Sequence, residues 1–198
     1  VVLDAHVATG FPVTIVRPSH TYDQRAIPLH FNGRNGSWSV VKRIVEGRPV
    51  VIHGDGEALW TFTWNDDFAA GFCGLFGNAD SIGRAVNITS DTSITWNEAF
   101  RTIADVVGGQ LDAVHVASET LVRWRPELEG TLLGDKTNSV IFDNTLIKTL
   151  VPGFRCPTTY VEGVARCWEY IQAHPEARVD DPEFDAFLDG VVDRVRGF

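Results

Sequence analysis

Methionine is absent from the 198 residues, and cysteine is scarce. Because an open reading frame begins with methionine, we expect this chain to be a processed or truncated piece of a longer protein. The three cysteines, Cys73, Cys156 and Cys167, contain no Cys-x-x-Cys pair, which argues against a disulfide framework and a structural zinc site. The six histidines also lack a spacing suited to a metal ion. We therefore expect no metal and a reducing, cytoplasmic location.

Long apolar runs and an excess of basic charge are missing as well. No run approaches the roughly 20 apolar residues that cross a bilayer, and the first residues lack the basic flank of a secretory signal. Seventeen basic side chains against twenty-six acidic ones give a net charge of -9, which disfavours a nucleic-acid partner. The 44% apolar content is enough to fill a core, so the sequence predicts a soluble globular chain with neither nucleic acid nor membrane as partner.

Short β-branched runs alternate with amphipathic stretches along the chain. This alternation predicts an α/β architecture. In it, Gly54-Asp55-Gly56 is expected to be either a tight turn between two partner strands or a loop on the substrate side. Residues Val1 to Thr9 are typical of the end of a helix. Strands are expected over residues 11–18, 49–53, 59–64, 85–89, 111–116 and 139–142, and helices over about 37–46, 65–76, 95–107, 143–150, 159–171 and 181–195.

Two helix starts carry a capping signal. Thr95 with Glu98, and Thr159 with Glu162, have the spacing of a capping box. Aromatic residues at helical spacing after these and other starts predict core stripes. The aromatic residues expected in the core are Phe68, Phe72, Trp96, Phe100 and Trp168, and the last helix is expected to turn Phe184, Leu188, Val191 and Val195 inward.

A series of short motifs follows the same order along the chain as in one known family. The motifs are Val-Thr-Ile-Val-Arg-Pro-Ser-His-Thr-Tyr at 13–22, Gly47-Arg48-Pro49, Gly54-Asp55-Gly56, Asp66-Asp67-Phe68-Ala69 and Ala-Val-Asn-Ile-Thr-Ser at 85–90. Together they resemble the extended short-chain dehydrogenases/reductases, or NAD-dependent epimerase/dehydratases. Ser19-His20-Thr21-Tyr22 with Leu133-Gly134-Asp135-Lys136 further resembles a nucleoside-diphosphate-sugar epimerase-like subgroup.

The resemblance implies the last strands and helices of a Rossmann-type doubly wound parallel sheet, with a small mixed α/β substrate-binding subdomain. Residues 1–22 and about 65–107 would belong to the Rossmann sheet, and about 23–64 and 108–198 mainly to the substrate-binding subdomain. The family's glycine-rich turn for NAD or NADP and its Tyr-x-x-x-Lys pair do not occur here, so we expect no catalytic residue and an absent N-terminal half. The parent would be a homodimer that uses the helix ending near Ala8.

The resemblance also assigns site residues. Pro18, Ser19 and His20 would bind the cofactor, and the substrate-binding residues would be His20, Tyr22, Trp60, Asp135 and Lys136. Four of these residues have a plain structural alternative: a strand end for Pro18, loop packing for His20, and a solvated ion pair for Asp135 with Lys136.

Trp60 stands where relatives acting on nucleotide sugars usually carry an arginine that grips the diphosphate. An indole cannot supply that charge. Either another cation, such as Arg43 or Lys136, holds a phosphate, or the substrate carries no diphosphate and stacks on Trp60.

Two functions remain open on the sequence. One is the substrate-binding portion of an NAD(P)-dependent epimerase, dehydratase or reductase whose small-molecule substrate could be a nucleotide sugar. The other is a noncatalytic, reductase-like protein that senses a metabolite or dinucleotide. The presence of Trp60 in place of the usual arginine favours this second function.

Overall fold

The structure is a computed structural model that describes residues 1–197. These residues form two compact units, each assembled from three segments of the chain. Unit 1 comprises Val1–Tyr22, Thr61–Ser93 and Ile141–Thr159, and unit 2 comprises Asp23–Trp60, Ile94–Val140 and Tyr160 onward. In the described part of the chain, no helix has the length and apolar character needed to cross a membrane.

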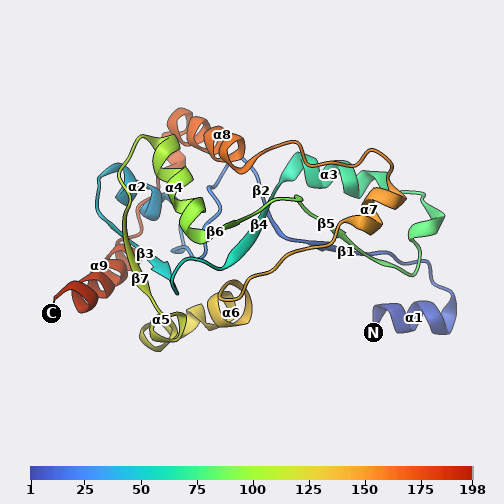
Figure 1. The fold of residues 1–198 in the computed structure, drawn as a ribbon, viewed down its shortest axis with the longest axis horizontal. Helices are drawn as coiled ribbons and strands as arrows, with labels where there is room; N and C mark the ends of the chain where they lie inside the picture. The colour runs from blue at the N-terminus through green and yellow to red at the C-terminus, as the bar shows by residue number, and fades with distance from the viewer. Residues whose placement is uncertain (198) are drawn as a thin grey trace. The chain divides into compact units, whose positions relative to one another are not determined.

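Unit 1 is built on short parallel strands (Figure 1). Strand β1 pairs in parallel with β5, with Ile15 opposite Ala85, and β2 pairs in parallel with β4, with His20 opposite Phe62. One face of β5 packs with α3 and α7 around a core cluster. The elements are α1 (Val2–Thr9), β1 (Ile15–Pro18), β2 (His20–Tyr22), most of β4 (Leu59–Trp64), α3 (Asn65–Gly74), η1 (Ala79–Ser81), β5 (Ala85–Ile88) and α7 (Thr145–Leu150). The cluster consists of Leu75, Val86, Ile88, Ile147, Leu150 and Phe154.

Unit 2 places helices around another parallel pair, β3 with β7, which run side by side in Figure 1. Helix α4 packs against α2 and α8, and α9 packs against both strands. The elements are α2 (Trp38–Val45), β3 (Pro49–His53), α4 (Trp96–Val107), β7 (Asp112–Val116), α5 (Ser118–Trp124), η2 (Pro126–Leu128), α6 (Glu129–Thr131), the π-helical turn η3 (Leu132–Lys136), α8 (Tyr160–Ala173), η4 (Pro175–Ala177) and α9 (Pro182–Arg196). The short strand β6 (Ser93–Thr95) leads into α4.

Helix α4 shows how local sequence fixes one of these elements. Thr95 Oγ1 accepts a hydrogen bond from the Glu98 amide, and the Glu98 carboxylate accepts one from the Thr95 amide. These two bonds satisfy backbone groups that the first helical turn leaves open, so the expected capping box is confirmed. Trp96 and Phe100 are fully buried on the inner face of this helix.

Two strand predictions are wrong. Strand β3 does not pair with β4: its partner is β7, and β4 belongs to a different sheet with the order β2-β4-β6. Residues 139–142 form no strand. Ser139 Oγ instead accepts from the Leu59 amide, and the Val140 amide donates to the Leu59 carbonyl.

Some expected core residues lie at the surface. Phe72 is 38% exposed and Val195 40% exposed, which contradicts their placement in core stripes, and Phe68 and Trp168 are only half-buried. Phe68 stacks on Phe72, and Phe72 meets Phe76 edge to face, so these rings pack on one another along α3.

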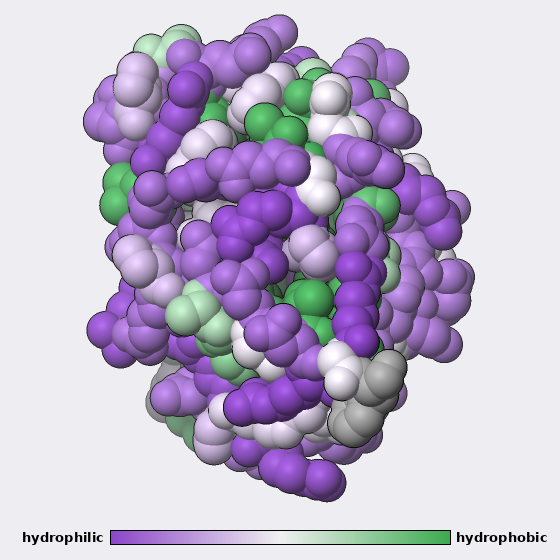
Figure 2. All heavy atoms as spheres, turned by 90° about the vertical axis from the view of Figure 1, so that its left-hand side faces the viewer, coloured by the Kyte–Doolittle hydropathy of each residue, from purple (hydrophilic) through white to green (hydrophobic). Residues whose placement is uncertain are grey.

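Figure 2 shows the face that lies at the left of Figure 1, where α2 and α9 are found. Hydrophilic side chains predominate on this face, and apolar atoms appear as small separate patches. This agrees with the net charge of -9, and the face offers no broad apolar surface for a partner.

Candidate functional site

In unit 1, the expected cofactor-binding residues lie at the carboxyl end of β1 and directly after it. Ser19 Oγ lies 2.7 Å from Thr63 Oγ1, and the Ser90 amide donates to the same Thr63 oxygen at 2.9 Å. Thr63 therefore ties together the two segments that leave β1 and β5. Because both strands are parallel, their carboxyl ends form one edge, which is where open α/β sheets bind ligands.

Pro18, His20 and Tyr22 differ in their exposure at this edge. Pro18 is exposed, while His20 packs against the Phe62 ring with centroids 5.5 Å apart. Tyr22 is buried and meets Trp64 edge to face. An exposed proline with fixed φ and the neighbouring Ser19 fit a planar cofactor ring, whereas no glycine-rich turn for a pyrophosphate occurs in residues 1–198.

In unit 2, the structure brings together three of the five expected substrate-binding residues, Trp60, Asp135 and Lys136. The Lys136 ammonium lies 5.5 Å from the centroid of the Trp60 ring and 2.8 Å from an Asp135 carboxylate oxygen. The Lys136 side chain is 13% exposed and the Asp135 side chain 50% exposed, so the cation lies deeper than its partner. A half-buried ammonium on an aromatic face is the arrangement of a cation–π contact.

The indole of Trp60 is not open to solvent. It is 5% exposed, and it also stacks on Trp96 with centroids 6.0 Å apart. A substrate that stacked on Trp60 would therefore have to displace Lys136.

Arg43, the other cation considered for a phosphate, is committed elsewhere. It is 1% exposed, and its guanidinium donates to Asp185 and Asp189 of α9 and to the Pro49 carbonyl. Of the two cations, Lys136 is therefore the one that remains available to bind a phosphate.

Sequence reasoning missed the residues behind Lys136. His53 Nε2 lies 2.9 Å from the Lys136 carbonyl oxygen, and the His53 ring stacks on His30 with centroids 5.0 Å apart. Both imidazoles are buried. Sequence reasoning set His53 and His30 aside because neither has a metal-spaced partner. One feature of the sequence does point to His53. The apolar run Val50–Ile52 is unbroken, which predicts a strand buried on both faces and hence a buried His53.

Burial controls the charge of this histidine pair. It lowers the pKa of His30 well below its ordinary value of 6.5, and the charge of His53 acts in the same direction. Burial also lowers the pKa of His53; the hydrogen bond to the Lys136 carbonyl opposes this effect, and the Lys136 ammonium adds to it. Both rings are therefore neutral at neutral pH.

The Gly54-Asp55-Gly56 turn is fixed to the start of α4 by Asn97. The Asn97 backbone amide donates to the Gly56 carbonyl, and its side-chain amide donates to the Asp55 carbonyl and to Glu57. Since the Asn97 side-chain oxygen can only accept, His115 Nε2 donates to it at 2.8 Å. The turn follows β3, so it ends the same strand that carries His53.

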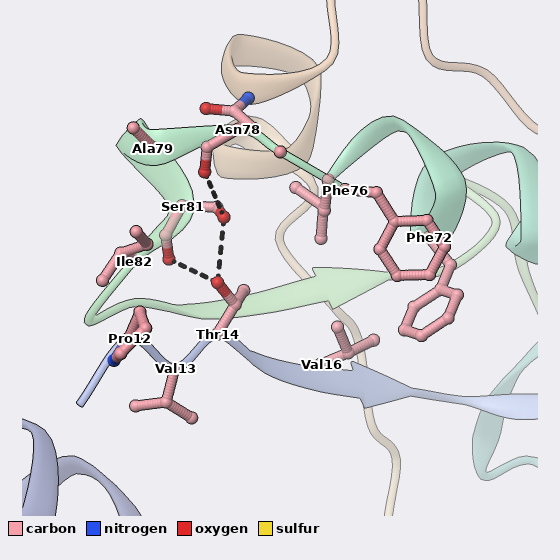
Figure 3. A pocket seen from close by; sticks show the side chains of 12 residues that line it. Pro12, Val13, Thr14, Val16, Phe72, Phe76, Asn78, Ala79, Ser81 and Ile82 are labelled. Carbon is pink, nitrogen blue, oxygen red and sulfur yellow. Dashed lines mark hydrogen bonds between the residues drawn. The ribbon is translucent and has the colours of Figure 1, made fainter.

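A cavity of about 400 Å³ opens in unit 1 beside β1 and the end of α3 (Figure 3). Val16, Phe72 and Phe76 give it apolar walls. The Thr14 hydroxyl donates to the Ser81 carbonyl, and the Ser81 hydroxyl donates to the Asn78 carbonyl. None of the expected site residues lines this cavity. Nowhere in residues 1–197 do three or more His, Cys, Asp or Glu side chains gather to hold a metal ion.

Residues 1–89 match the model of the NAD dependent epimerase/dehydratase family. The resemblance carried by the motifs is thereby confirmed for this part of the chain.

A curated relative and two solved structures extend the comparison. The 2'-dehydrokanamycin reductase of Streptomyces kanamyceticus is 25% identical over 121 residues, which are 61% of this chain and 34% of the relative. An epimerase structure from Methanothermobacter thermautotrophicus is 15% identical, with a TM-score of 0.69 over 88% of this chain and 47% of that one. The UDP-glucuronic acid 4-epimerase of Bacillus cereus, in complex with UDP-glucuronic acid and NAD, is 17% identical, with a TM-score of 0.64 over 85% of this chain and 48% of that one.

At these identities the solved structures show the fold alone, and they confirm the expected α/β, Rossmann-type class. The chain spans about half the length of these solved structures and about a third of the curated relative.

Proposed function

We propose that this chain is the substrate-binding portion of an NAD(P)-dependent epimerase, dehydratase or reductase that acts on a sugar nucleotide or a related sugar. The family match over residues 1–89 supports the class of enzyme. The observation that carries the binding role is the Lys136 ammonium, held half-buried between Trp60 and Asp135. Such a cation can pair with an anionic group of a substrate.

In this proposal the two units have different roles. Unit 1 would contribute the last strands of the Rossmann sheet, with Pro18, Ser19 and His20 as its cofactor-binding residues, and Trp60, Asp135 and Lys136 of unit 2 would bind the substrate. NAD(P) supplies the hydride acceptor when it is bound. No Tyr-x-x-x-Lys pair occurs in residues 1–198, so the proposed role of this portion is to bind and orient rather than to transfer protons. We further propose that the intact protein is a homodimer. We also propose a cytoplasmic location, with which the three free cysteines agree.

The relatives suggest which substrates to test. The Bacillus cereus structure contains UDP-glucuronic acid, and the Streptomyces kanamyceticus enzyme is named as a reductase of a dehydrokanamycin. The intact protein should be incubated with NAD or NADP and with UDP-glucuronic acid, UDP-glucose, dTDP-glucose or an oxidised aminoglycoside. We expect dinucleotide binding and, with one of these substrates, a new product by NMR. Failure to bind either dinucleotide would overturn the proposal.

Lys136 gives the sharper test of the site. In Lys136→Ala we expect the KM of the active substrate to rise about tenfold and kcat to change less, because a binding charge is lost. Lys148→Ala is the matched control, since Lys148 pairs with Asp91 in unit 1 and is 46% exposed. Equal kinetics in the two variants would remove Lys136 from the substrate site.

A further inference from the structure

A buried histidine, His53, forms a hydrogen bond with the backbone carbonyl of Lys136. His53 is 2% exposed, and its Nε2 lies 2.9 Å from the Lys136 carbonyl oxygen. A carbonyl oxygen can only accept, so Nε2 carries the proton and donates it. The bond joins the last residue of β3 to the last residue of η3.

The turn that carries Lys136 needs such an anchor. It is a π-helical turn, a geometry that is rare and recurs at functional sites. Beyond the bond from His53, the Thr137 hydroxyl donates to Ser118 Oγ at 2.8 Å, and the Thr137 amide donates to the Leu132 carbonyl. A lysine side chain loses conformational freedom when it is ordered, and a fixed backbone lowers the further cost of holding its ammonium in one place.

We infer that His53 is a positioning residue, whose Nε2–H holds the Lys136 carbonyl so that the ammonium stays over Trp60 and beside Asp135. The inference rests on the proposed function, because the position matters only if Lys136 binds the substrate. The ring of His30 stacks on that of His53, with centroids 5.0 Å apart. A neutral His53 also adds no second positive charge next to the ammonium.

Two substitutions separate this role from simple filling of the core. His53→Gln keeps an N–H donor close to the place of Nε2. His53→Phe keeps a ring that can stack on His30 and loses the donor. If His53 only fills space, His53→Phe should be the better tolerated of the two; if it positions Lys136, His53→Gln should be.

The first measurement uses no ligand. The intact protein is acylated briefly at its lysines, and the extent at each lysine is read by peptide mass spectrometry. Residues 1–198 contain three lysines, so Lys42 and Lys148 serve as internal controls. We expect His53→Phe to raise the rate at Lys136 by up to about tenfold, the value of one hydrogen bond, and His53→Gln to leave it within about twofold. An unchanged rate at Lys136 in His53→Phe would overturn the inference.

The second measurement uses UDP-glucuronic acid, or whichever probe proves active. We expect His53→Phe to raise KM more than it lowers kcat, and His53→Gln to restore most of the loss. A change in acylation without a change in KM for any probe would refute the proposed function and leave the positioning role standing. An unchanged acylation rate would refute the positioning role, whatever the KM.

The unaltered protein provides a test if His53→Phe does not fold. In a protein with ¹⁵N-labelled histidine, NMR reports which ring nitrogen of His53 carries the proton and how fast that proton exchanges. We expect a protonated Nε2 whose proton exchanges slowly. A proton on Nδ1, or loss of the Nε2 proton as fast as from an exposed histidine, would overturn the inference.

Discussion

The guanidinium of Arg43 is a fully buried charge whose counter-ions come from a distant helix. It donates to Asp185 and Asp189, which lie on α9, and to the backbone of Pro49 at the start of β3. Burying a charge is costly unless it is paired and hydrogen-bonded, and here every arm of the guanidinium has a partner. Arg43 therefore joins α2, β3 and α9 in a single contact.

Removing Arg43 should destabilise the fold strongly. We expect Arg43→Ala to lower the free energy of unfolding by about 3 kcal/mol, because two carboxylates lose their partner and a cavity is left. Lys42→Ala is the neighbouring control: its exposed ion pair with Asp180 is worth less than about 1 kcal/mol. Urea unfolding of both variants would measure the difference, and equal losses would contradict the buried role of Arg43.

The cysteines should differ in reactivity. Burial raises the pKa of Cys156 to about 12, helped by the nearby carboxylates of Asp67 and Asp91, and burial likewise raises the pKa of Cys167 to about 12. Because the thiolate is the reactive form, we expect both to resist alkylation in the folded protein, while the exposed Cys73 reacts first. Rapid labelling of Cys167 without denaturant would contradict this.

Single site residues could be foreseen only in part. The sequence singles out Trp60 and Lys136 separately. The two residues are far apart along the chain, so their contact is seen only in the folded structure. The role of His53 was missed because it acts through the backbone of another residue, and a backbone acceptor leaves no mark in the sequence.

At the scale of elements, the Gly54-Asp55-Gly56 turn offers a matched pair of positions. Both glycines have positive φ, 61° for Gly54 and 76° for Gly56. A side chain at Gly54 would meet open space, whereas a Cβ at Gly56 would lie 2.3 Å from the Asn97 side-chain oxygen. The two positions thus share the backbone strain and differ in the contact.

We expect the two alanine substitutions to separate these effects. Gly54→Ala should lower the free energy of unfolding by about 1 kcal/mol, because alanine disfavours a left-handed backbone conformation. Gly56→Ala should lower it by about 3 kcal/mol, because Asn97 must also lose hydrogen bonds to the turn. Thermal and urea unfolding would measure both. Similar losses would mean that Asn97 yields without cost.

Elements set by local signals were predicted well, and those set by distant partners were not. The capping box of α4 and the bounds of β3 and β4 follow from residues close in sequence. The supposed β3–β4 hairpin failed because β3 is buried along Val50–His53, as expected of a parallel strand covered on both faces, and such strands pair through long crossovers. The strand expected over residues 139–142 failed because a serine side chain takes the place of a backbone partner opposite Leu59.

At the scale of the whole molecule, His30 and His53 predict a loss of stability in weak acid. Their pKa values are lowered in the folded state, so the unfolded chain binds more protons once the pH falls below the ordinary value of 6.5. The free energy of unfolding should therefore keep its highest value above about pH 7 and fall between about pH 6.5 and 5. The unfolded chain binds between one and two more protons than the folded one in this range, so the slope is at most about 2.7 kcal/mol per pH unit.

Urea unfolding over this range would measure the slope. The lowered pKa values of the aspartates, such as Asp112 beside Arg196, remove stability only at lower pH, near their ordinary value of 3.8 and below. The double variant with His30→Phe and His53→Gln should flatten the curve between pH 6.5 and 5. An unchanged slope in this variant would show that other groups are responsible.

The dependence of Arg43 on α9 bears on how the chain is made. The ribosome releases Arg43 and β3 long before Asp185 and Asp189, and the partner strand β7 also emerges about sixty residues after β3. Until the last helix leaves the exit tunnel, the guanidinium has no carboxylate to enter the core with. Unit 2 should then be completed only after α9 has emerged from the ribosome, and a nascent chain stalled before α9 should be digested there by a protease that spares the released protein.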